Sequence, residues 1–324
     1  MNSDNIEPDW KPSTSQETLR ARAQMLTSIR SFFQHKNVLE VDTPSLSLGT
    51  ITDVYLEPMT SQCQSIGQGK VLLYLQTSPE FAMKRLLASG SGCIYQICRA
   101  FRNDELGRFH NPEFLMLEWY RVGFDHKQLM SEMDELLMLI LESEPADRIS
   151  YQQLFLDTLQ IDPLTVSDDA LNQLVLSKAN GPDLDDRDQN LQCLFSTLIE
   201  PDLAPNKPLM VYDFPASQSA LARLSTTDSR VADRFEVYYR GVELANGFHE
   251  LKDADEQRQR FLDDNAQRKL LNKSAQPLDE RFLAALNSGL PNCAGVALGL
   301  DRLLMLKLKK ASISDVLPFP LDIA

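Results

Sequence analysis

Strand-like segments joined by short turns are the feature that most limits the fold of this chain. Parallel neighbours need a crossover of about a dozen residues or more, whereas antiparallel neighbours can be joined by a tight turn. Apolar alternation and turn signals predict strands at 37–44, 71–76, 93–102, 114–123, 210–215, 234–240 and 294–300. Because most of them are separated by turns rather than crossover helices, the sequence predicts an α+β domain with helices packed on an antiparallel sheet.

Helical periodicity predicts the elements that cover this sheet. Residues 16–36 place apolar side chains at helical spacing, and further helices are expected at 78–89, 126–142, 167–180, 254–271 and from 301 onward. Residues 1–15 are polar and contain two prolines, which predicts a loose arm. We expect residues 16–324 to form a single domain in which 145–207 is a helical insertion.

Composition and cysteine spacing restrict the class of protein. Hydrophobic residues make up 43% and charged residues 24% of the 324 residues, as in water-soluble globular domains. No apolar run approaches the roughly 20 residues of a membrane span, and the N-terminus lacks the pattern of a signal peptide. We therefore expect a cytoplasmic protein with no membrane partner. The five cysteines are scattered and form no CxxC pair, so reduced structural thiols are expected rather than a zinc site.

The formal net charge of −14 bears on the partners of the chain. Proteins that hold a long polyanion usually carry a basic face, because neutralising phosphates supplies much of the affinity. The acidic balance therefore argues against binding of tRNA or DNA and favours a basic partner.

Residues 102–114 place several cations in one polar loop between two strands. A hairpin here would aim Arg102, Arg108 and His110 at one spot, and guanidinium groups suit phosphate because their donors are forked and always charged. Phe114 could offer its ring to a base. On charge counting alone, a salt-bridged hairpin explains the stretch equally well.

A second candidate phosphate site lies at the last strand. Gly295 and Gly299 would allow a ligand to approach the backbone closely, and Asp301-Arg302 then opens an amphipathic helix. The start of a helix favours a negative group, and Arg302 stands beside it. Tight packing of the strand on the helix is the alternative explanation for the glycines.

Residues 235–251 predict a hairpin that pairs two acids. If Arg240-Gly241 is a two-residue turn, Tyr238 pairs with Glu243, and Glu236 and Glu243 lie on one face. Two carboxylates there could hold Mg²⁺ together with nucleotide phosphates. A three-residue loop would reverse this parity, and a solvated sheet face is the alternative for each acid alone.

A third group of acids predicts a site for a diamine. The Ser78-Pro79 corner should project Glu80 from the first turn of a helix. Further polar side chains are expected near it over the sheet, namely Glu118, Tyr120, Asn246 and Glu250. An anionic pocket with a phenol and an amide suits a ligand that carries two amino groups.

Taken together, these segments resemble the class II aminoacyl-tRNA synthetases, and lysyl-tRNA synthetase most closely. VLEVDTPSL resembles the first class motif, FRNDELGRFHNPEFLMLEWY the second and GVALGLDRLLML the third, while ELANGFHELKDADEQ is similar to the lysine-pocket segment. The resemblance covers roughly residues 16–320. It implies a six- or seven-stranded antiparallel sheet with flanking helices, assembled as a homodimer with Pro44 at the interface.

The resemblance implies roles for the nucleotide site. Arg102 would hold the α-phosphate and Arg302 the γ-phosphate, and both are the expected catalytic residues. Adenine would lie between Phe114 and Arg302, and Glu236 and Glu243 would bind Mg²⁺. The full set expected around ATP is Arg102, Asn103, Asp104, His110, Asn111, Phe114, Glu243, Leu244, Gly299 and Arg302.

It also implies roles for the amino-acid site. Glu80 would take one amino group, Glu118, Tyr120 and Glu250 the distal ammonium, and Asn246 the carboxylate. The full set expected around the amino acid is Ser78, Pro79, Glu80, Glu118, Tyr120, Asn246, Glu250 and Ala297.

Three departures from the synthetase pattern refine the expectation. Only a short arm precedes the first helix, which leaves no space for an anticodon-binding barrel. Ala297 stands where synthetases have glycine, and one methyl group could discriminate between amino acids by about 1–3 kcal/mol. Asp104 replaces the usual glutamate, but Glu105 follows it.

With these departures the chain is most similar to the bacterial elongation factor P lysine ligases. That resemblance implies an ATP-dependent ligase that activates (R)-β-lysine and transfers it to a lysine of elongation factor P. The alternatives are a truncated synthetase that charges tRNA and a catalytically silent adenylate-binding regulator.

Overall fold

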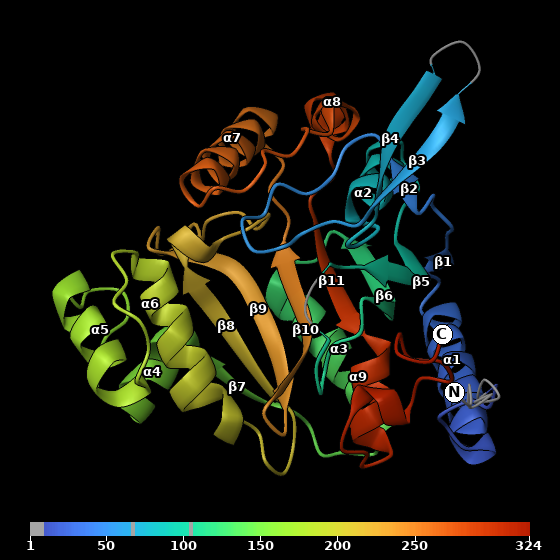
Figure 1. The fold of residues 1–324 in the computed structure, drawn as a ribbon, viewed down its shortest axis with the longest axis horizontal. Helices are drawn as coiled ribbons and strands as arrows, with labels where there is room; N and C mark the ends of the chain where they lie inside the picture. The colour runs from blue at the N-terminus through green and yellow to red at the C-terminus, as the bar shows by residue number, and fades with distance from the viewer. Residues whose placement is uncertain (1–9, 66–68, 104–105) are drawn as a thin grey trace, which may run out of the picture.

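The fold is built on a mixed sheet that runs through the whole molecule (Figure 1). The computed structural model describes residues 10–65, 69–103 and 106–324. Within these ranges the large sheet has eight strands. Their spatial order is β1 (Leu39–Glu40), β5 (Ile94–Phe101), β6 (Glu113–Val122), β11 (Cys293–Gly299), β10 (Val242–His249), β9 (Val231–Tyr239), β8 (Leu209–Pro215) and β7 (Asp147–Ser150).

The directions of the strands largely agree with the sequence-based expectation. Every neighbouring pair from β5 to β8 is antiparallel, which gives six inner antiparallel strands. The edge pairs β1–β5 and β7–β8 are parallel. The α+β class is therefore confirmed, while the purely antiparallel six- to seven-stranded sheet is extended by two short edge strands. Strand β1 lies within the strand that was expected at 37–44, whereas β7 was not expected because four residues are too few to show alternation.

A second, three-stranded sheet projects from one end of the molecule (Figure 1). It contains β2 (Leu46–Ser47), β4 (Gly69–Leu75) and β3 (Thr60–Ser65). The expected strand at 71–76 is present as β4, but it pairs here and not in the large sheet.

The expected helices are present with small shifts of their ends. The helices are α1 (Gln16–His35), α2 (Glu80–Ala88), α3 (His126–Leu141), α4 (Tyr151–Leu159), α5 (Asp168–Leu174), α6 (Arg187–Leu194), α7 (Ala254–Leu270), α8 (Glu280–Gly289) and α9 (Leu300–Lys307). Local capping fixes several starts: Ser15 Oγ accepts from the Thr18 amide, and Asp125 with Gln128 forms a capping box before α3.

One face of the large sheet is covered by α1, α3 and α9, which contact one another and the central strands. Alternate strand residues such as Trp119, Phe235 and Leu298 point into this layer and are fully buried. The Phe33 ring of α1 stacks on Tyr95 at 4.4 Å between centroids. The largest apolar core of the molecule therefore lies on this side.

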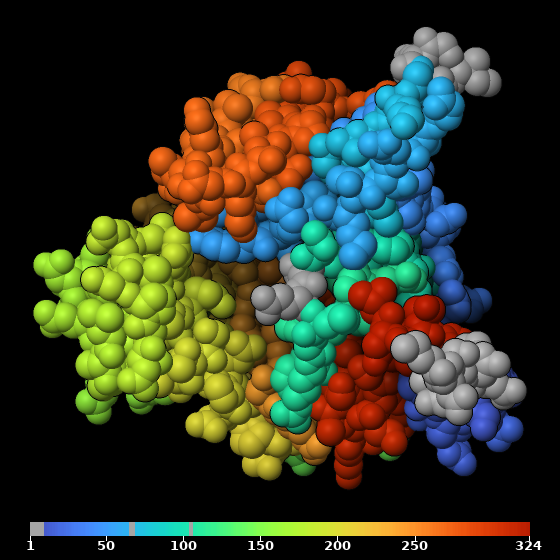
Figure 2. All heavy atoms as spheres, viewed as in Figure 1, coloured from blue at the N-terminus to red at the C-terminus, as the bar shows by residue number. Residues whose placement is uncertain are grey.

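The opposite face is covered only at its ends. Helices α2, α7 and α8 pack over one end around Phe261 and Phe282, and the insertion packs over the other end around Tyr151 and Phe195. Between them the surface is hollowed down to the sheet (Figure 2). This arrangement leaves the middle strands available to ligands.

The insertion at 145–207 is largely helical, as expected. It contains α4, α5 and α6, with π-helical turns at Val175–Ala179 and Phe195–Ile199. Its first segment is the edge strand β7, which joins it to the large sheet through β8. The insertion thus adds one edge strand to the large sheet. Its helices pack on β8 and β9 through a small aromatic core.

The two chain termini are tied together. Ser13 Oγ donates to Leu317 O at 2.7 Å and Thr14 Oγ1 to Asp315 O at 3.0 Å, so the expected loose arm ends before Ser13; residues 1–9 lie outside the described ranges. Behind this contact, Arg22 of α1 forms a buried ion pair with Asp301 of α9 at 2.6 Å. No helix among the described residues has the length and apolarity required to cross a bilayer.

Candidate active site

Two adjoining cavities lie on the open face of the sheet, with volumes of about 580 and 360 Å³. Leu56, Arg102, Asn246 and Ala297 line both of them and mark their junction. The acids that were expected around a diamine line the larger cavity, and most residues that were expected around a nucleotide line the smaller one. Successive side chains of a strand point to opposite faces of the sheet. Trp119 of β6 points into the helical layer, so its neighbours Glu118 and Tyr120 point toward the cavities.

Carboxylates and hydroxyl groups line the floor of the larger cavity. Ser78 Oγ and Tyr120 Oη each donate to Glu118 at 2.6 Å. Ser78 Oγ also accepts from the Glu80 amide at 3.0 Å, which fixes the corner before α2. The expected cluster around Glu118 is therefore assembled.

Lys84 is a member of this cluster that sequence reasoning missed. Its fully buried Nζ lies 2.6 Å from Glu80 Oε1 and 2.5 Å from Glu250 Oε2. Glu80 and Glu250 therefore each share a charge with Lys84 while they line the larger cavity. The i, i+4 spacing of Glu80 and Lys84 on α2 was the signal that could have revealed this pair.

The electrostatics of this cluster favour an additional cation. Three carboxylates face one ammonium, and Glu250 Oε1 is buried without a hydrogen-bond partner among the described residues. Burial raises the pKa of Glu118 to about 7, and the Glu80 charge adds to the rise. Burial raises the pKa of Glu250 to about 8 although Lys84 opposes the shift. An incoming ammonium would favour the ionised form of both acids.

Two small residues of β11 shape this cavity. A Cβ on Gly295 would lie 2.3 Å from the Tyr120 ring and 2.5 Å from Glu250 Oε1. The protein itself therefore occupies the space that was expected to admit a ligand at Gly295. Ala297 pairs with Glu118 on β6 and Asn246 on β10, so its methyl group lies between the acid cluster and the junction of the cavities.

Arg302 joins three segments around the smaller cavity. It donates from Nε to Phe109 O at 3.1 Å and from Nη1 to Glu243 O at 2.8 Å, and Nη2 lies 2.7 Å from His110 Nε2. Arg102 lies over the Phe114 ring at 5.2 Å from its centroid. Two guanidinium groups and an aromatic ring therefore meet where a nucleotide was expected.

The other residues expected around ATP are partly brought together. The cavity wall includes His110, Asn111, Phe114, Glu243, Leu244, Gly299 and Arg302. A Cβ on Gly299 would meet no atom closer than 3.7 Å, so here the space is open toward the cavity. Asn103 is exposed beside Arg102 and lines neither cavity, so its role stays a prediction. Asp104 lies outside the described residues.

One expectation is corrected at Arg108, and the role expected of Pro79 stays a prediction. Arg108 does not point into the site, because its Nε donates to Ala311 O at 2.7 Å and its guanidinium lies over the Phe109 ring. Pro79 directly precedes α2 and lines a small neighbouring cavity but not the larger one. Pro79 fixes the turn before α2 and thereby positions Glu80, the first residue of that helix.

The hairpin β9–β10 has the two-residue turn that was expected. Arg240 and Gly241 both have positive φ, and Tyr238 pairs with Glu243. Glu236 accepts hydrogen bonds from Arg234 and Tyr238, and Glu243 Oε2 lies 3.8 Å from Arg302 Nη1. Both acids line the smaller cavity, as a metal site beside the phosphates requires.

Glu200 is a third acid at this position that the sequence did not reveal. Burial raises its pKa to about 7, and the charges of Glu243 and Glu236 add to the rise. Burial likewise raises the pKa of Glu236, with a contribution from Glu243. Mutually repelling carboxylates of this kind fit a divalent cation, which would relieve the repulsion.

The cysteines have no part in this site. All five are free thiols, as expected. Burial raises the pKa of Cys98 and of Cys293 to about 12, so both remain protonated and unreactive at neutral pH.

Comparison with known proteins agrees with this geometry. The family described as tRNA synthetases class II (D, K and N) matches residues 7–323. The chain belongs to this family. Within it, the chain is 54% identical to an elongation factor P–(R)-β-lysine ligase of Vibrio atlanticus over 96% of this chain and 98% of the relative. It is 53% identical to the enzymes of that name from Edwardsiella ictaluri and Vibrio cholerae, over 97% and 96% of this chain and 98% of each relative.

Membership of the class II family explains the layout of the cavities. The segments that resemble the second and third class motifs supply Arg102 and Arg302 to the smaller cavity, and the segment after the β9–β10 turn supplies Asn246 and Glu250 to the larger one. Ala297, which departs from the synthetase pattern, lies at the junction of the cavities.

Proposed function

We propose that this protein is an ATP-dependent ligase that activates (R)-β-lysine as an adenylate and transfers it to a lysine ε-amine of elongation factor P. The observation that carries the proposal is an amino-acid cavity with three carboxylates around Lys84, adjoining a cavity with two arginines. The relatives of that name match nearly the whole chain.

In the first step, a carboxylate oxygen of β-lysine attacks the α-phosphorus of ATP, and the bond to pyrophosphate breaks. Arg102 lies at the junction of the cavities and is placed to hold the α-phosphate. Arg302 and His110 would contact the departing phosphates. These fixed donors stabilise charge that builds on phosphate oxygens without needing to reorganise.

The amino acid is held by its two ammonium groups. One of them would lie against Glu250 Oε1 and Glu118, and the second beside Glu80. Arg234 Nε donates to Asn246 Oδ1 at 3.3 Å, which fixes the Asn246 amide close to the junction where the carboxylate reacts. Ala297 narrows this junction and would favour the β-amino acid.

In the second step, the neutral ε-amine of the acceptor lysine attacks the carbonyl carbon of the adenylate. The bond to AMP breaks, and the nitrogen loses a proton as the amide forms. No enzyme nucleophile is required, which agrees with the protonated thiols.

The residues present also fit Mg²⁺. Glu236 and Glu243 would hold it with Glu200 nearby, since burial and the Glu243 charge raise the pKa of both Glu200 and Glu236. When bound, Mg²⁺ neutralises charge on the phosphates of ATP. Hydrogen bonds from Arg234 and Tyr238 hold the Glu236 carboxylate toward the smaller cavity.

The exposed surface near Pro44 and the acidic charge of the chain bear on its assembly and its acceptor. Residues 16–324 would act as one catalytic domain in the cytoplasm, in a homodimer. Pro44 is exposed, and the nearby side chains of Leu39, Leu46 and Leu48 are 57%, 45% and 53% exposed, which suits burial by a second copy. The acidic charge of the chain argues against tRNA as the acceptor.

The test is ATP–pyrophosphate exchange with (R)-β-lysine and with L-α-lysine, followed by addition of elongation factor P or tRNA. We expect exchange that favours β-lysine and a mass gain on the protein. Ala297→Gly is the matched variant and should shift the preference toward α-lysine by roughly tenfold or more. Label on tRNA would support a tRNA-charging synthetase instead, and ATP binding without exchange would support a silent regulator.

A further inference from the structure

Three buried polar side chains meet on the sheet face opposite the two cavities. His126 is the first residue of α3, Asp233 lies in β9 and His249 is the last residue of β10. Asp233 shares the parity of buried Phe235 and so points into the helical layer. The exposed fractions of His126, Asp233 and His249 are 5%, 5% and 3%.

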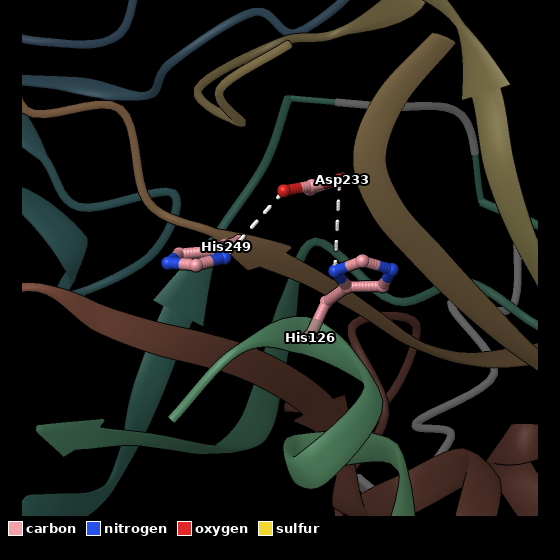
Figure 3. A group of neighbouring side chains, drawn as sticks. All are labelled: His126, Asp233 and His249. Atoms are coloured by element: carbon pink, nitrogen blue, oxygen red, sulfur yellow. Dashed lines mark ion pairs between the residues drawn. The ribbon is translucent and has the colours of Figure 1, made fainter. Parts of the chain in front are cut away.

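Both imidazole rings are turned toward the same carboxylate (Figure 3). His126 Nδ1 lies 3.8 Å from Asp233 Oδ1, and His249 Nδ1 lies 3.5 Å from Asp233 Oδ2. One ligating atom from each residue lies within 4.8 Å of the others. A tetrahedral zinc site spaces its ligands by about 3.3 Å, given bonds of about 2.0 Å. Small rotations of these side chains would therefore close the cluster around an ion.

The outer nitrogen of each histidine faces an acceptor. His249 Nε2 lies 2.9 Å from Asn292 Oδ1, and His126 Nε2 lies 3.7 Å from Asp213 Oδ1. Metal-binding histidines usually donate their second N–H to a carbonyl or carboxylate oxygen in this manner. Asp213 has a φ of 57° at an irregularity of the β8–β9 pairing, so the backbone departs from regular strand geometry at the residue that faces His126.

The inner nitrogens lack partners that a neutral histidine requires. In the tautomer in which Nε2 of His249 donates to Asn292, its Nδ1 carries a lone pair that faces the Asp233 carboxylate. His249 Nδ1 and both ring nitrogens of His126 are buried and have no hydrogen-bond partner among the described residues. A lone pair beside a carboxylate is unfavourable unless a cation lies between them.

We propose that His126, Asp233 and His249 bind one divalent transition-metal ion of the Zn²⁺ type. Two imidazole nitrogens and one carboxylate suit Zn²⁺ better than Mg²⁺, and a water molecule would complete the shell. Arg223 Nε donates to Asp233 Oδ2 at 2.8 Å, so Oδ1 is the oxygen left for the metal. The ion would link the start of α3 to β9 and β10, the hairpin that carries Glu236 and Glu243 on its other face. This site is separate from the proposed Mg²⁺ site.

The test begins with full-length protein that has been dialysed against a chelator. Zn²⁺ is then added alone, and bound metal is measured by mass spectrometry after gel filtration, with Co²⁺ absorption as a second probe. We expect one Zn²⁺ per chain and a Tm increase of about 4 °C at a Zn²⁺ concentration a hundredfold above Kd. Co²⁺ should give the visible absorption of a tetrahedral site.

Two variants and one control identify the ligands. His126→Gln removes a ligand whose ring nitrogens have no hydrogen-bond partner among the described residues, so it should fold. Asp233→Asn is a second variant of nearly equal shape. Both should lose the bound Zn²⁺ and the Tm increase. His35→Asn removes an exposed histidine and should keep both.

Three outcomes would overturn the proposal. One is wild-type protein that binds no Zn²⁺ and shows no Tm increase. Another is Zn²⁺ that remains in both variants or is lost in the His35→Asn control. The third is a metal-free protein whose stability rises on acidification and does not respond to Zn²⁺, which would identify a proton as the cation at His249.

Discussion

Gly295 is the position where one added methyl group tests the geometry of the amino-acid cavity most directly. A Cβ there would lie 2.3 and 2.4 Å from two atoms of the Tyr120 ring and 2.5 Å from Glu250 Oε1. Real Cβ atoms do not approach other atoms so closely, and the Tyr120 ring is itself buried. Gly295→Ala must therefore displace the two side chains that we assign to the distal ammonium.

The size of the effect follows from the packing. Inserting a methyl group into a filled core usually costs about 1–3 kcal/mol of stability. The displaced Glu250 would also lose its placement against Lys84, which holds it at 2.5 Å. A shift of about 1 Å in a positioning group can reduce the rate about a hundredfold. We expect Gly295→Ala to fold, to unfold more easily by about 1–3 kcal/mol and to lose roughly two orders of magnitude in amino-acid-dependent exchange.

Gly299→Ala is the matched control on the same strand. Its Cβ would meet no atom closer than 3.7 Å, and its φ of −74° suits alanine. The new methyl group would lie near Arg302, on the nucleotide side. This variant should therefore keep its stability within about 1 kcal/mol and raise the KM for ATP while leaving the KM for the amino acid unchanged.

The assay is ATP–pyrophosphate exchange at varied ATP and varied amino acid, with urea denaturation of both variants. Exchange by Gly295→Ala at the wild-type level, with unchanged stability, would refute the packing that we describe around Tyr120. An equal effect of both variants on the KM for the amino acid would refute the division of the site into two cavities.

Three other predictions follow from the contacts. Arg102→Ala should abolish exchange in a protein that still folds, because we assign the side chain to the phosphates; wild-type exchange would remove it from the site. Asp301→Ala leaves the buried Arg22 charge without its ion-pair partner, so the free energy of unfolding should fall by about 3–5 kcal/mol; a change below about 1 kcal/mol in urea denaturation would contradict this. Because burial raises the pKa of Glu118 from 4.5 to about 7, stability without substrate should fall as the pH rises from about 5 to 7, by at most about 1.4 kcal/mol per pH unit. Glu118→Gln should flatten that slope, and an unchanged slope would show that the acid is not buried.

The inner sheet could be predicted from the sequence because its strands alternate clearly. The parity argument at Glu236 and Glu243 held because Arg240-Gly241 forms the two-residue turn that its residues favour. The edge strand β7 could not be predicted, since four residues show no period, whereas β1 lies inside the strand expected at 37–44. Strand β4 was predicted, but its place in a second sheet was not. The alternation of apolar and polar residues in one strand does not show which strands it pairs with.

The sequence predicted which polar residues line the site, but it did not predict all of the residues that they contact. Glu118, Tyr120 and Glu250 meet as expected, whereas Lys84 was missed because a lysine on a helix is usually exposed, although its i, i+4 spacing from Glu80 indicated that pair. Glu200 lies some forty residues from Glu243 in sequence and comes close through the turn between the insertion and the sheet. Contacts of this kind depend on tertiary packing.

Successive side chains of the hairpin β9–β10 point to opposite faces of the sheet, so the hairpin contributes residues both to the cavities and to the proposed Zn²⁺ site. Along β9, Asp233 points into the helical layer while Arg234 and Glu236 point into the cavities. His249 and Glu250 divide in the same way where β10 ends. A metal ion bound at Asp233 would therefore stiffen the strands whose other face holds the substrates, without contacting them. Loss of that ion should then alter the stability of the hairpin before it alters the chemistry of the site.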